Sequence, residues 1–336
     1  MDDKVKFSAQ QRMKGFCRVC PQCDGRACAG EVPGMGGTGT GASFKQNIRA
    51  LEQIKIQMRT MHSVQQADTG LELFGRRLDM PILVSPLGGV HYNMTSSISE
   101  LDYIYGMTAG ANMAGTLCGT GDGEVPEIFA AALKAFSTYP ETTLPFIKPW
   151  AQPQLDARIE QLSAAGADVC GMDIDAAGLI TLKELGQPVY PKTPREIQQI
   201  ISSSEMKWIL KGVMTADEAR IAVDAGASAI VVSNHGGRVL DHTPGTADVL
   251  PEIVEAVGSA ITVLVDGGVR CGTDVFKLLA LGADAVMIGR PAAIAAIGGG
   301  AEALTAELIS YREELRQVMV MTGAAEVSSI DSTKIR

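Results

Sequence analysis

The sequence predicts an α/β fold, a (β/α)8 TIM barrel preceded by an N-terminal extension, on three observations. Three segments resemble one another: AGADVCGMDID (165–175), AGASAIVVSNH (225–235) and LGADAVMIGRP (281–291). Each carries a glycine suited to a helix end and then a short apolar run that stops at a polar residue, as in a repeated βα unit. The predicted strands are continuous apolar runs, which indicates a parallel sheet covered on both faces. Eight such units from about residue 76 onward fill the length of a barrel.

The other five predicted strands are PILVSP (81–86), ANMAGTL (111–117), LPFIKPW (144–150), KWILKGV (207–213) and ITVLVDGG (261–268). A helix-like stretch follows each strand; in TADEARIAVDAG, Thr215 caps, Glu218 completes a capping box and Gly226 ends the helix. An open doubly wound sheet is the alternative, but no GxGxxG follows the first strand. We assign residues 1–75 to the extension, a Cys- and Gly-rich loop plus the helix ASFKQNIRALEQIKIQM, and 76–336 to the barrel.

Composition restricts the partners and the location. The net charge of −9 argues against nucleic acid, which requires a basic surface. The longest apolar candidate, AVMIGRPAAIAAIGGGA, contains Arg290, so we expect no membrane span. The start MDDKVKFSAQQRMKG lacks the apolar region of a signal peptide, and the seven cysteines therefore predict reduced thiols in the cytoplasm.

Polar and glycine residues follow the later strands, where a barrel of this kind builds its active site. Lys211 ends the fifth strand, and Ser233, His235 and Arg238 follow the sixth. Asp266 to Arg270 follow the seventh, and Gly289 and Arg290 the eighth. Glycines let backbone N–H groups approach a phosphate, and basic side chains lie beside both glycine turns. An imidazole can accept a proton near neutral pH, and a guanidinium can hold a carboxylate in a bidentate pair. A phosphate-bearing ligand is therefore expected.

Three segments carry a specific resemblance: LKGVMTADEA, VVSNHGGRVLDHTPGTADVLPEIVEAV and VDGGVRCGTDVFKLLALGADAVMIGRP. They resemble the C-terminal half of the FMN-dependent α-hydroxy-acid oxidase and dehydrogenase family, which includes glycolate oxidase and lactate oxidase. The match is nearly continuous over residues 210–291, and SNHGGR is its most specific motif. PILVSPLGG and FKQNIRALEQIKIQMRTM extend it in register toward the N-terminus.

The resemblance implies an FMN-dependent oxidation of a small, lactate- or glycolate-like 2-hydroxy acid to the 2-oxo acid. It makes His235 the base, Arg238 the clamp on the substrate carboxylate, and Lys211 the charge beside the flavin N1–C2 edge. Asp175 corresponds to an acidic partner near the flavin. It further implies a homo-oligomer, with oxygen or an unknown redox partner as electron acceptor. The implied FMN contacts are Pro86, Leu87, Gly88, Lys211, Ser233, Asp266, Gly267, Gly268, Val269, Arg270, Gly289 and Arg290.

The sequence departs from the family pattern around the substrate. The early loop reads GMGGTGTGA and lacks the usual Tyr, and the second Tyr position falls around Ile147 to Trp150, where Lys148 or Trp150 could take the space. Thr120 stands roughly where the family has a Trp, and Asp173 where a Thr is common. The loop DAAGLITLKELG offers only Lys183 in place of an Arg. The resemblance thus supports the flavin and the redox class more strongly than any particular hydroxy acid.

Four cysteines, Cys17, Cys20, Cys23 and Cys28, lie close together in CRVCPQCDGRAC. Such spacing could ligate zinc or an iron–sulfur cluster through thiolates. The alternatives are a redox-active thiol pair and a loop with reduced cysteines that caps the barrel mouth. We therefore assign no residue as a metal ligand from the sequence.

Three other functions are alternatives to the redox function. A flavin-dependent isomerase of the isopentenyl diphosphate type has a similar barrel but should lack the His and Arg of SNHGGR. A phosphate-binding barrel without redox activity would not need Lys211, His235 and Arg238 together. IMP dehydrogenase has similar phosphate loops but needs a nucleophilic Cys, which HGGRVLDHTPG lacks.

Overall fold

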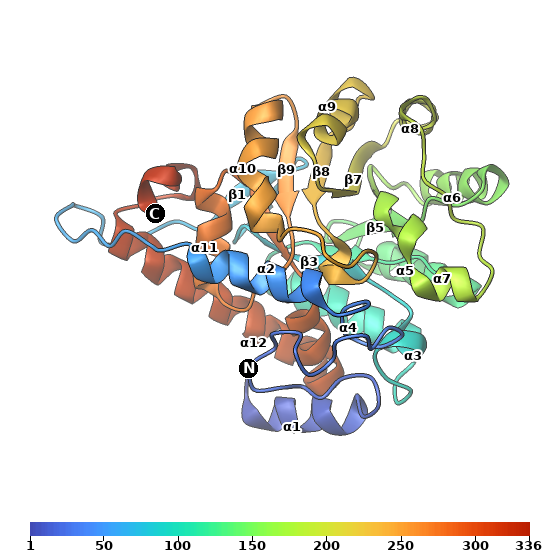
Figure 1. Cartoon of the computed structure of the whole chain (residues 1–336), viewed down its shortest axis with the longest axis horizontal. Coiled ribbons are helices and arrows are strands. Elements are labelled where there is room, and N and C mark those ends of the chain that lie inside the picture. Colours follow the sequence, from blue (N-terminus) through green and yellow to red (C-terminus); the bar gives the residue numbers. More distant parts are fainter.

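The centre of the molecule is a closed barrel of eight parallel strands in a computed structural model that describes residues 1–336 (Figure 1). Strands adjacent in sequence are paired in space, and the last strand closes against the first. The barrel prediction is therefore confirmed. The strands are β3 (Ile82–Leu87), β4 (Cys118–Thr120), β5 (Thr143–Ile147), β6 (Val169–Asp173), β7 (Lys207–Val213), β8 (Ala229–Val232), β9 (Thr262–Val265) and β10 (Ala285–Ile288).

One predicted strand was wrong. Residues 111–113 of the expected strand ANMAGTL belong to helix α4 (Glu100–Met113), and the second strand is the short β4, residues 118–120. Gly115, with φ of 72°, turns the chain between the two elements. Ala and Met favour helix, so local preference extends α4 where we expected a strand.

Helices follow the strands and cover the outside of the barrel (Figure 1). Gly166, Gly226 and Gly282 have φ of 83°, 86° and 105° just before β6, β8 and β10, as the repeated segments predict. The helices after α4 are α5 (Pro126–Thr138), α6 (Gln152–Ala164), α7 (Ile180–Glu184), α8 (Pro194–Ser202), α9 (Ala216–Asp224), α10 (Thr246–Val257), α11 (Gly272–Ala280) and α12 (Arg290–Thr322).

The core has two parts. Alternate strand side chains such as Leu83, Phe146 and Met287 fill the barrel interior, together with Leu73 and Leu78 of an antiparallel hairpin, β1 (Leu71–Leu73) and β2 (Arg76–Leu78). The remaining strand side chains pack outward against the helices in a larger apolar cluster. Because the interior is filled, the active site must lie at a barrel end.

The N-terminal residues lie against the barrel and not apart from it (Figure 1). Helix α1 (Asp3–Arg12) packs on α12, and α2 (Ala42–Gln53) packs on α10 and on a 3-10 turn, η2 (His235–Gly237). The helix predicted over 42–58 ends at Gln53. Helix α1 was not predicted, because only Ala9 of its residues is buried and no apolar stripe marks it. The expected boundary at residue 75 falls in the turn of the β1–β2 hairpin.

Helix α12 is long and apolar enough, by length and composition alone, to cross a membrane. Its backbone leaves helical geometry at Gly299 and Gly300, so it consists of two shorter helices. More than half of its most apolar window is buried against the rest of the protein, where it packs on α1, α4 and α11. Its place is that of a core helix.

Candidate active site

The carboxyl ends of the strands surround a cavity of about 1020 Å³. Two of the predicted site residues do not line it: Ser233 is fully buried behind it, and Asp175 touches it only through His235. The predicted residues that line the cavity are Pro86, Leu87, Gly88, Lys211, His235, Arg238, Asp266, Gly267, Gly268, Val269, Arg270, Gly289 and Arg290. Most of the residues that the sequence predicts for the site therefore lie around one cavity.

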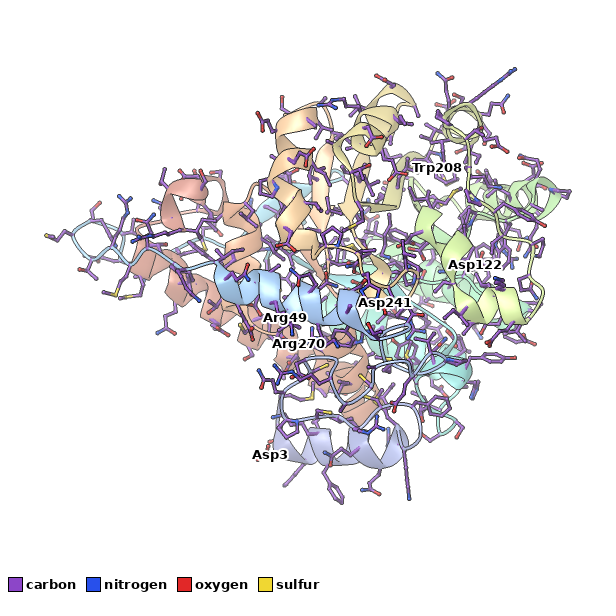
Figure 2. The ribbon with its side chains drawn as sticks, viewed as in Figure 1. Asp3, Arg49, Asp122, Trp208, Asp241 and Arg270 are labelled. Atoms are coloured by element: carbon purple, nitrogen blue, oxygen red, sulfur yellow. The ribbon has the colours of Figure 1, made fainter.

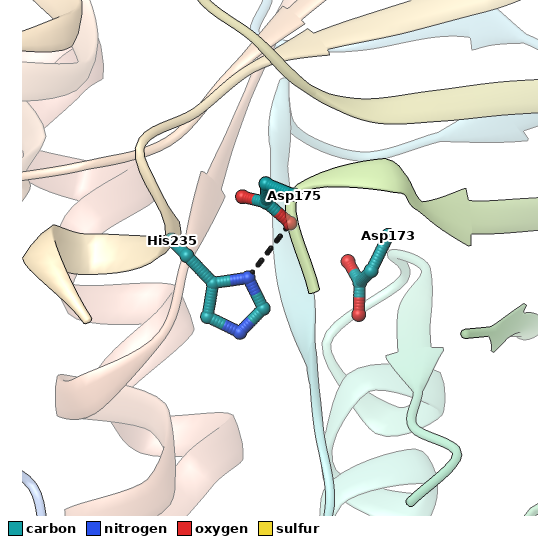
Figure 3. Close-up of side chains that lie close together, drawn as sticks. All are labelled: Asp173, Asp175 and His235. Atoms are coloured by element: carbon teal, nitrogen blue, oxygen red, sulfur yellow. Dashed lines mark hydrogen bonds and ion pairs between the residues drawn. The ribbon is translucent and has the colours of Figure 1, made fainter. Parts of the chain in front are cut away.

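His235 and Asp175 form a hydrogen-bonded pair at the cavity wall. Asp175 Oδ1 lies 2.9 Å from His235 Nδ1, which leaves Nε2 as the ring nitrogen toward the cavity (Figure 3). Burial lowers the pKa of His235 below its ordinary value and outweighs the opposing charge of Asp175. The imidazole is therefore neutral near pH 7 and can accept a proton.

The turn that carries His235 is shaped by three consecutive left-handed residues. His235, Gly236 and Gly237 have φ of 55°, 63° and 76°. A side chain at Gly236 would place its Cβ 2.6 Å from an Arg290 nitrogen, and one at Gly237 would meet the backbone of Phe44 at 2.5 Å. The glycines of SNHGGR are thus required by close packing as well as by backbone conformation.

A second network joins two buried lysines through Asp173. Lys148 Nζ lies 2.6 Å from Asp173 Oδ2, and Lys211 Nζ lies 3.2 Å from Asp173 Oδ1. Burial alone would raise the pKa of Asp173, but the two ammonium groups outweigh it and hold that pKa well below its usual range. The converse holds for Lys211, where carboxylates overcome burial and raise the pKa. Asp173, Asp175 and His235 have the spacing of a metal site, yet Lys211 already supplies positive charge there.

Several residues that line the cavity were not predicted, or were predicted only as alternatives. Of the two candidates for the missing Tyr position, Lys148 lines the cavity, whereas Trp150 is fully buried and its indole N–H donates to Asp122 at 2.5 Å. Asp122 and Glu124 also line the cavity and were missed. Lys183 is exposed on α7 and does not line it.

Arg238 projects from the His235 turn into the same cavity. Its guanidinium donates to Asn93 Oδ1 at 2.7 Å and to the carbonyl oxygen of Gly34. Burial, followed by the neighbouring charge of Arg290, lowers the pKa of Arg238 to about 9. It therefore stays charged at neutral pH, as a carboxylate clamp requires.

A backbone anion site lies beside β9. Gly267 and Gly268 have φ of 101° and 83°, and the N–H groups of Gly267, Gly268 and Val269 donate to no protein acceptor. Successive free N–H groups in such a turn form a nest for an anion. Asp266 Oδ1 and Ser85 Oγ are likewise buried without a partner at the cavity wall. A cavity with a nest for a phosphate at one end and polar groups along its wall fits FMN.

The two arginines expected near the phosphate turn toward the N-terminal loop. Arg290 donates to the carbonyl oxygens of Met35 and Gly36 at 2.7 and 2.9 Å, and its guanidinium lies 3.8 Å over the Phe44 ring. Arg270 donates to the carbonyl oxygen of Cys23 at 3.0 Å and lies beside α2 (Figure 2). The sequence placed both at the cavity but gave no indication of these partners.

Helix α2 holds the His235 turn and the nest together. The amides of Asn47 and Asn234 exchange two hydrogen bonds, at 2.8 and 2.9 Å, and Asn47 Oδ1 also accepts from the Thr246 N–H at 3.1 Å. A Cβ at Gly268 would lie 2.4 Å from the Asn47 carbonyl oxygen. Asp241, at the beginning of α2 in Figure 2, accepts from the Ala42 N–H at 2.8 Å.

Comparison with known proteins gives one consistent result. The family model described as FMN-dependent dehydrogenase matches residues 34–184 and 173–336. A 4-hydroxymandelate oxidase of Amycolatopsis orientalis is 30% identical over 90% of this chain and 94% of its own. An L-lactate oxidase of Nostoc sp. is 29% identical over 89% and 91%. The crystal structure of mandelate oxidase with (S)-2-phenylpropionate matches with a TM-score of 0.78 at 26% identity, over 99% and 96%.

Proposed function

The chain belongs to the FMN-dependent dehydrogenase family, and we propose that it oxidises a small 2-hydroxy acid to the 2-oxo acid at the cavity around His235. The observation that carries this proposal is the placing of a neutral base, a guanidinium and a buried ammonium around a cavity that ends in a backbone nest. Proteins similar to this chain include oxidases named for lactate, glycolate and 4-hydroxymandelate.

FMN supplies the two-electron acceptor when it is bound. The N–H groups of Gly267, Gly268 and Val269 would hold its phosphate, with Gly289, Arg270 and Arg290 beside them. The backbone of Pro86, Leu87 and Gly88 would follow the flavin ring, and Lys211 would face its negatively charged edge when reduced. Ser233 would act from behind, because its Oγ accepts the N–H of His235 at 3.1 Å.

His235 would remove a proton from the hydroxy acid through Nε2. Asp175 holds Nδ1 at 2.9 Å, which fixes the orientation of the ring and stabilises the imidazolium once the proton has arrived. The lowered pKa of His235 keeps the base unprotonated before substrate binds. His235 and Asp175 therefore act as a base and its positioning residue.

Arg238 would bind the substrate carboxylate. The carboxylate would replace the neutral oxygens of Gly34 and Asn93 as acceptors of its N–H groups, which gives charge-assisted hydrogen bonds in their place. Lys148, paired with Asp173, lines the same cavity at the position where the family pattern has a Tyr, and it would contact the polar part of the substrate.

The test uses the visible spectrum of the purified protein during anaerobic addition of a panel of 2-hydroxy acids. We expect flavin absorbance that one of the acids bleaches, and recovery on admitting air would identify oxygen as an acceptor. His235→Ala should keep FMN but lose bleaching, whereas the control His242→Ala, at an exposed residue of the same loop, should behave as the wild type. A bound flavin that no hydroxy acid bleaches would contradict the proposal and favour the isomerase alternative.

A further inference from the structure

Four cysteines outside the proposed chemistry line one small cavity. Cys17, Cys20, Cys23 and Cys28 come from the loop between α1 and α2, and all four border a space of about 420 Å³. None of them is in a disulfide. The other wall residues are mostly apolar, but Arg18, Arg290 and Asp24 also border the space, so two cations and one carboxylate lie beside the cysteines.

The backbone of this loop has an unusual conformation between the first two cysteines. Val19, between the first two cysteines, has φ of 48°, a left-handed conformation that a β-branched residue rarely adopts. Its N–H donates to Cys17 Sγ at 3.3 Å. Such strain persists where the surroundings enforce it, and N–H groups that point at sulfur are a feature by which proteins tune bound clusters.

Positive charge lies against the sulfurs. Arg270 donates to Cys23 Sγ at 3.4 Å, and Arg290 lines the cysteine cavity. Neither guanidinium has a carboxylate partner among its ion pairs or hydrogen bonds; both donate to backbone carbonyls. Beyond the FMN phosphate expected beside them, these two guanidinium groups would also stabilise an anionic group among the cysteines. A four-iron core ligated by four thiolates carries about two net negative charges.

The separation of the sulfurs distinguishes a cluster from a single ion. Zinc holds its thiolate sulfurs about 2.3 Å from the metal, so the sulfurs lie roughly 4 Å apart. No three of these sulfurs lie within 4.8 Å of one another, which is too wide a spacing for one tetrahedral zinc ion. A polynuclear cluster holds its thiolates further apart, and the run C-x2-C-x2-C resembles that of bacterial iron–sulfur proteins.

We infer that Cys17, Cys20, Cys23 and Cys28 ligate an iron–sulfur cluster in the wall of the cofactor cavity. Met35 and Arg290 line both cavities, so one layer of side chains separates them. On the outer side, Cys20 and Cys23 border an open cavity of about 1100 Å³ with the exposed Pro21 and Gln22. The cluster therefore stands between the flavin and solvent.

At this position the cluster could relay electrons from the flavin to the surface. The relay rests on the proposed function, whereas the presence of the cluster is independent of it. Oxidation of one hydroxy acid delivers two electrons to the flavin. They leave one at a time: each reduces the oxidised cluster by one electron, which the cluster passes to a one-electron acceptor at the surface. Two such transfers return the flavin to its oxidised form, and the two protons are released to solvent.

The presence of the cluster is tested on the whole chain, residues 1–336, purified anaerobically and reconstituted with ferrous iron and sulfide. We expect about four iron and four acid-labile sulfide per chain, and an EPR signal after dithionite reduction. Replacement of Cys17, Cys20, Cys23 and Cys28 by Ser should remove iron, sulfide and signal but retain bound FMN. Cys271→Ser, a half-buried cysteine outside the loop, is the matched control and should keep them all. Single Cys28→Ser should lower iron content if the fourfold variant fails to fold.

Stoichiometric zinc without sulfide, or folded FMN-bound protein that takes up no iron, would overturn the inference. So would a cluster that survives in the fourfold variant. The relay is tested by anaerobic addition of the hydroxy acid that bleaches the flavin: the EPR signal should appear in the wild type and be absent in the cysteine variants. A bleached flavin beside a still oxidised cluster would refute the relay alone. Failure of every acid would refute the proposed function and leave the dithionite result valid.

Discussion

Replacement of Asp175 by Asn removes a negative charge beside His235 while the side chain keeps nearly the same size. The carboxylate oxygen lies 2.9 Å from Nδ1, so it faces a full positive charge once the imidazole has taken a proton. Opposite charges about 4 Å apart interact by about 4 kcal/mol at an effective dielectric constant near 20. The amide would retain a hydrogen bond of about 1 kcal/mol. The net loss is about 3 kcal/mol, or roughly 100-fold in the rate of flavin reduction.

Stopped-flow measurement of flavin bleaching against pH tests this. His235 must be neutral to act, so the rate rises as pH increases through its pKa. Asp175 raises that pKa, and its loss should move the rise to lower pH while the plateau falls. Asp224→Asn, an exposed carboxylate on α9, is the control and should change neither. An Asp175→Asn protein with the wild-type plateau and pH profile would refute the role of Asp175.

Two further substitutions separate binding from folding. Arg238→Lys keeps the charge but loses the planar guanidinium that can bind a carboxylate through two hydrogen bonds. The free energy of substrate binding should weaken by about 1.5–3 kcal/mol, so KM should rise about tenfold to 100-fold while the flavin spectrum stays unaltered. An unchanged KM in steady-state assays would rule out the role of Arg238 in binding the carboxylate. Leu83→Ala empties part of the fully buried barrel interior and should lower the free energy of unfolding by about 2–5 kcal/mol in urea titrations, while FMN still binds. Wild-type stability of that variant would mean that the interior is not closely packed.

The barrel was predictable because its strands repeat: a glycine with positive φ, an apolar run and a polar end recur at β6, β8 and β10. The second strand was not, because Cys118 to Thr120 is too short to show a pattern and the residues before it favour helix. That error had a consequence at the site. Because the strand was predicted at residues 111–117, the residues that follow the real strand, β4, were not considered as site residues. Asp122 and Glu124 of GTGDGE were therefore missed.

Contacts between distant segments could not be predicted either. The sequence shows arginines beside glycine turns, which is typical of a phosphate site. It does not show that Arg270 meets Cys23, 247 residues earlier, or that Arg290 meets Met35, 255 residues earlier. Local patterns record the residues at a strand end, whereas the direction of a long side chain depends on which segment covers that end.

The exchange of hydrogen bonds between Asn47 and Asn234 ties helix α2 to the turn that carries His235 in the proposed active site. Division of the chain at residue 75 would separate one amide from the other and leave the Gly268 turn without its neighbour. It would also cut the hairpin whose Leu73 and Leu78 pack in the barrel interior. Loss of the cofactor and local loosening of the first 75 residues should therefore be coupled, since the same helix supports both. Protection of this segment from proteolysis would then report the loading of the enzyme with flavin.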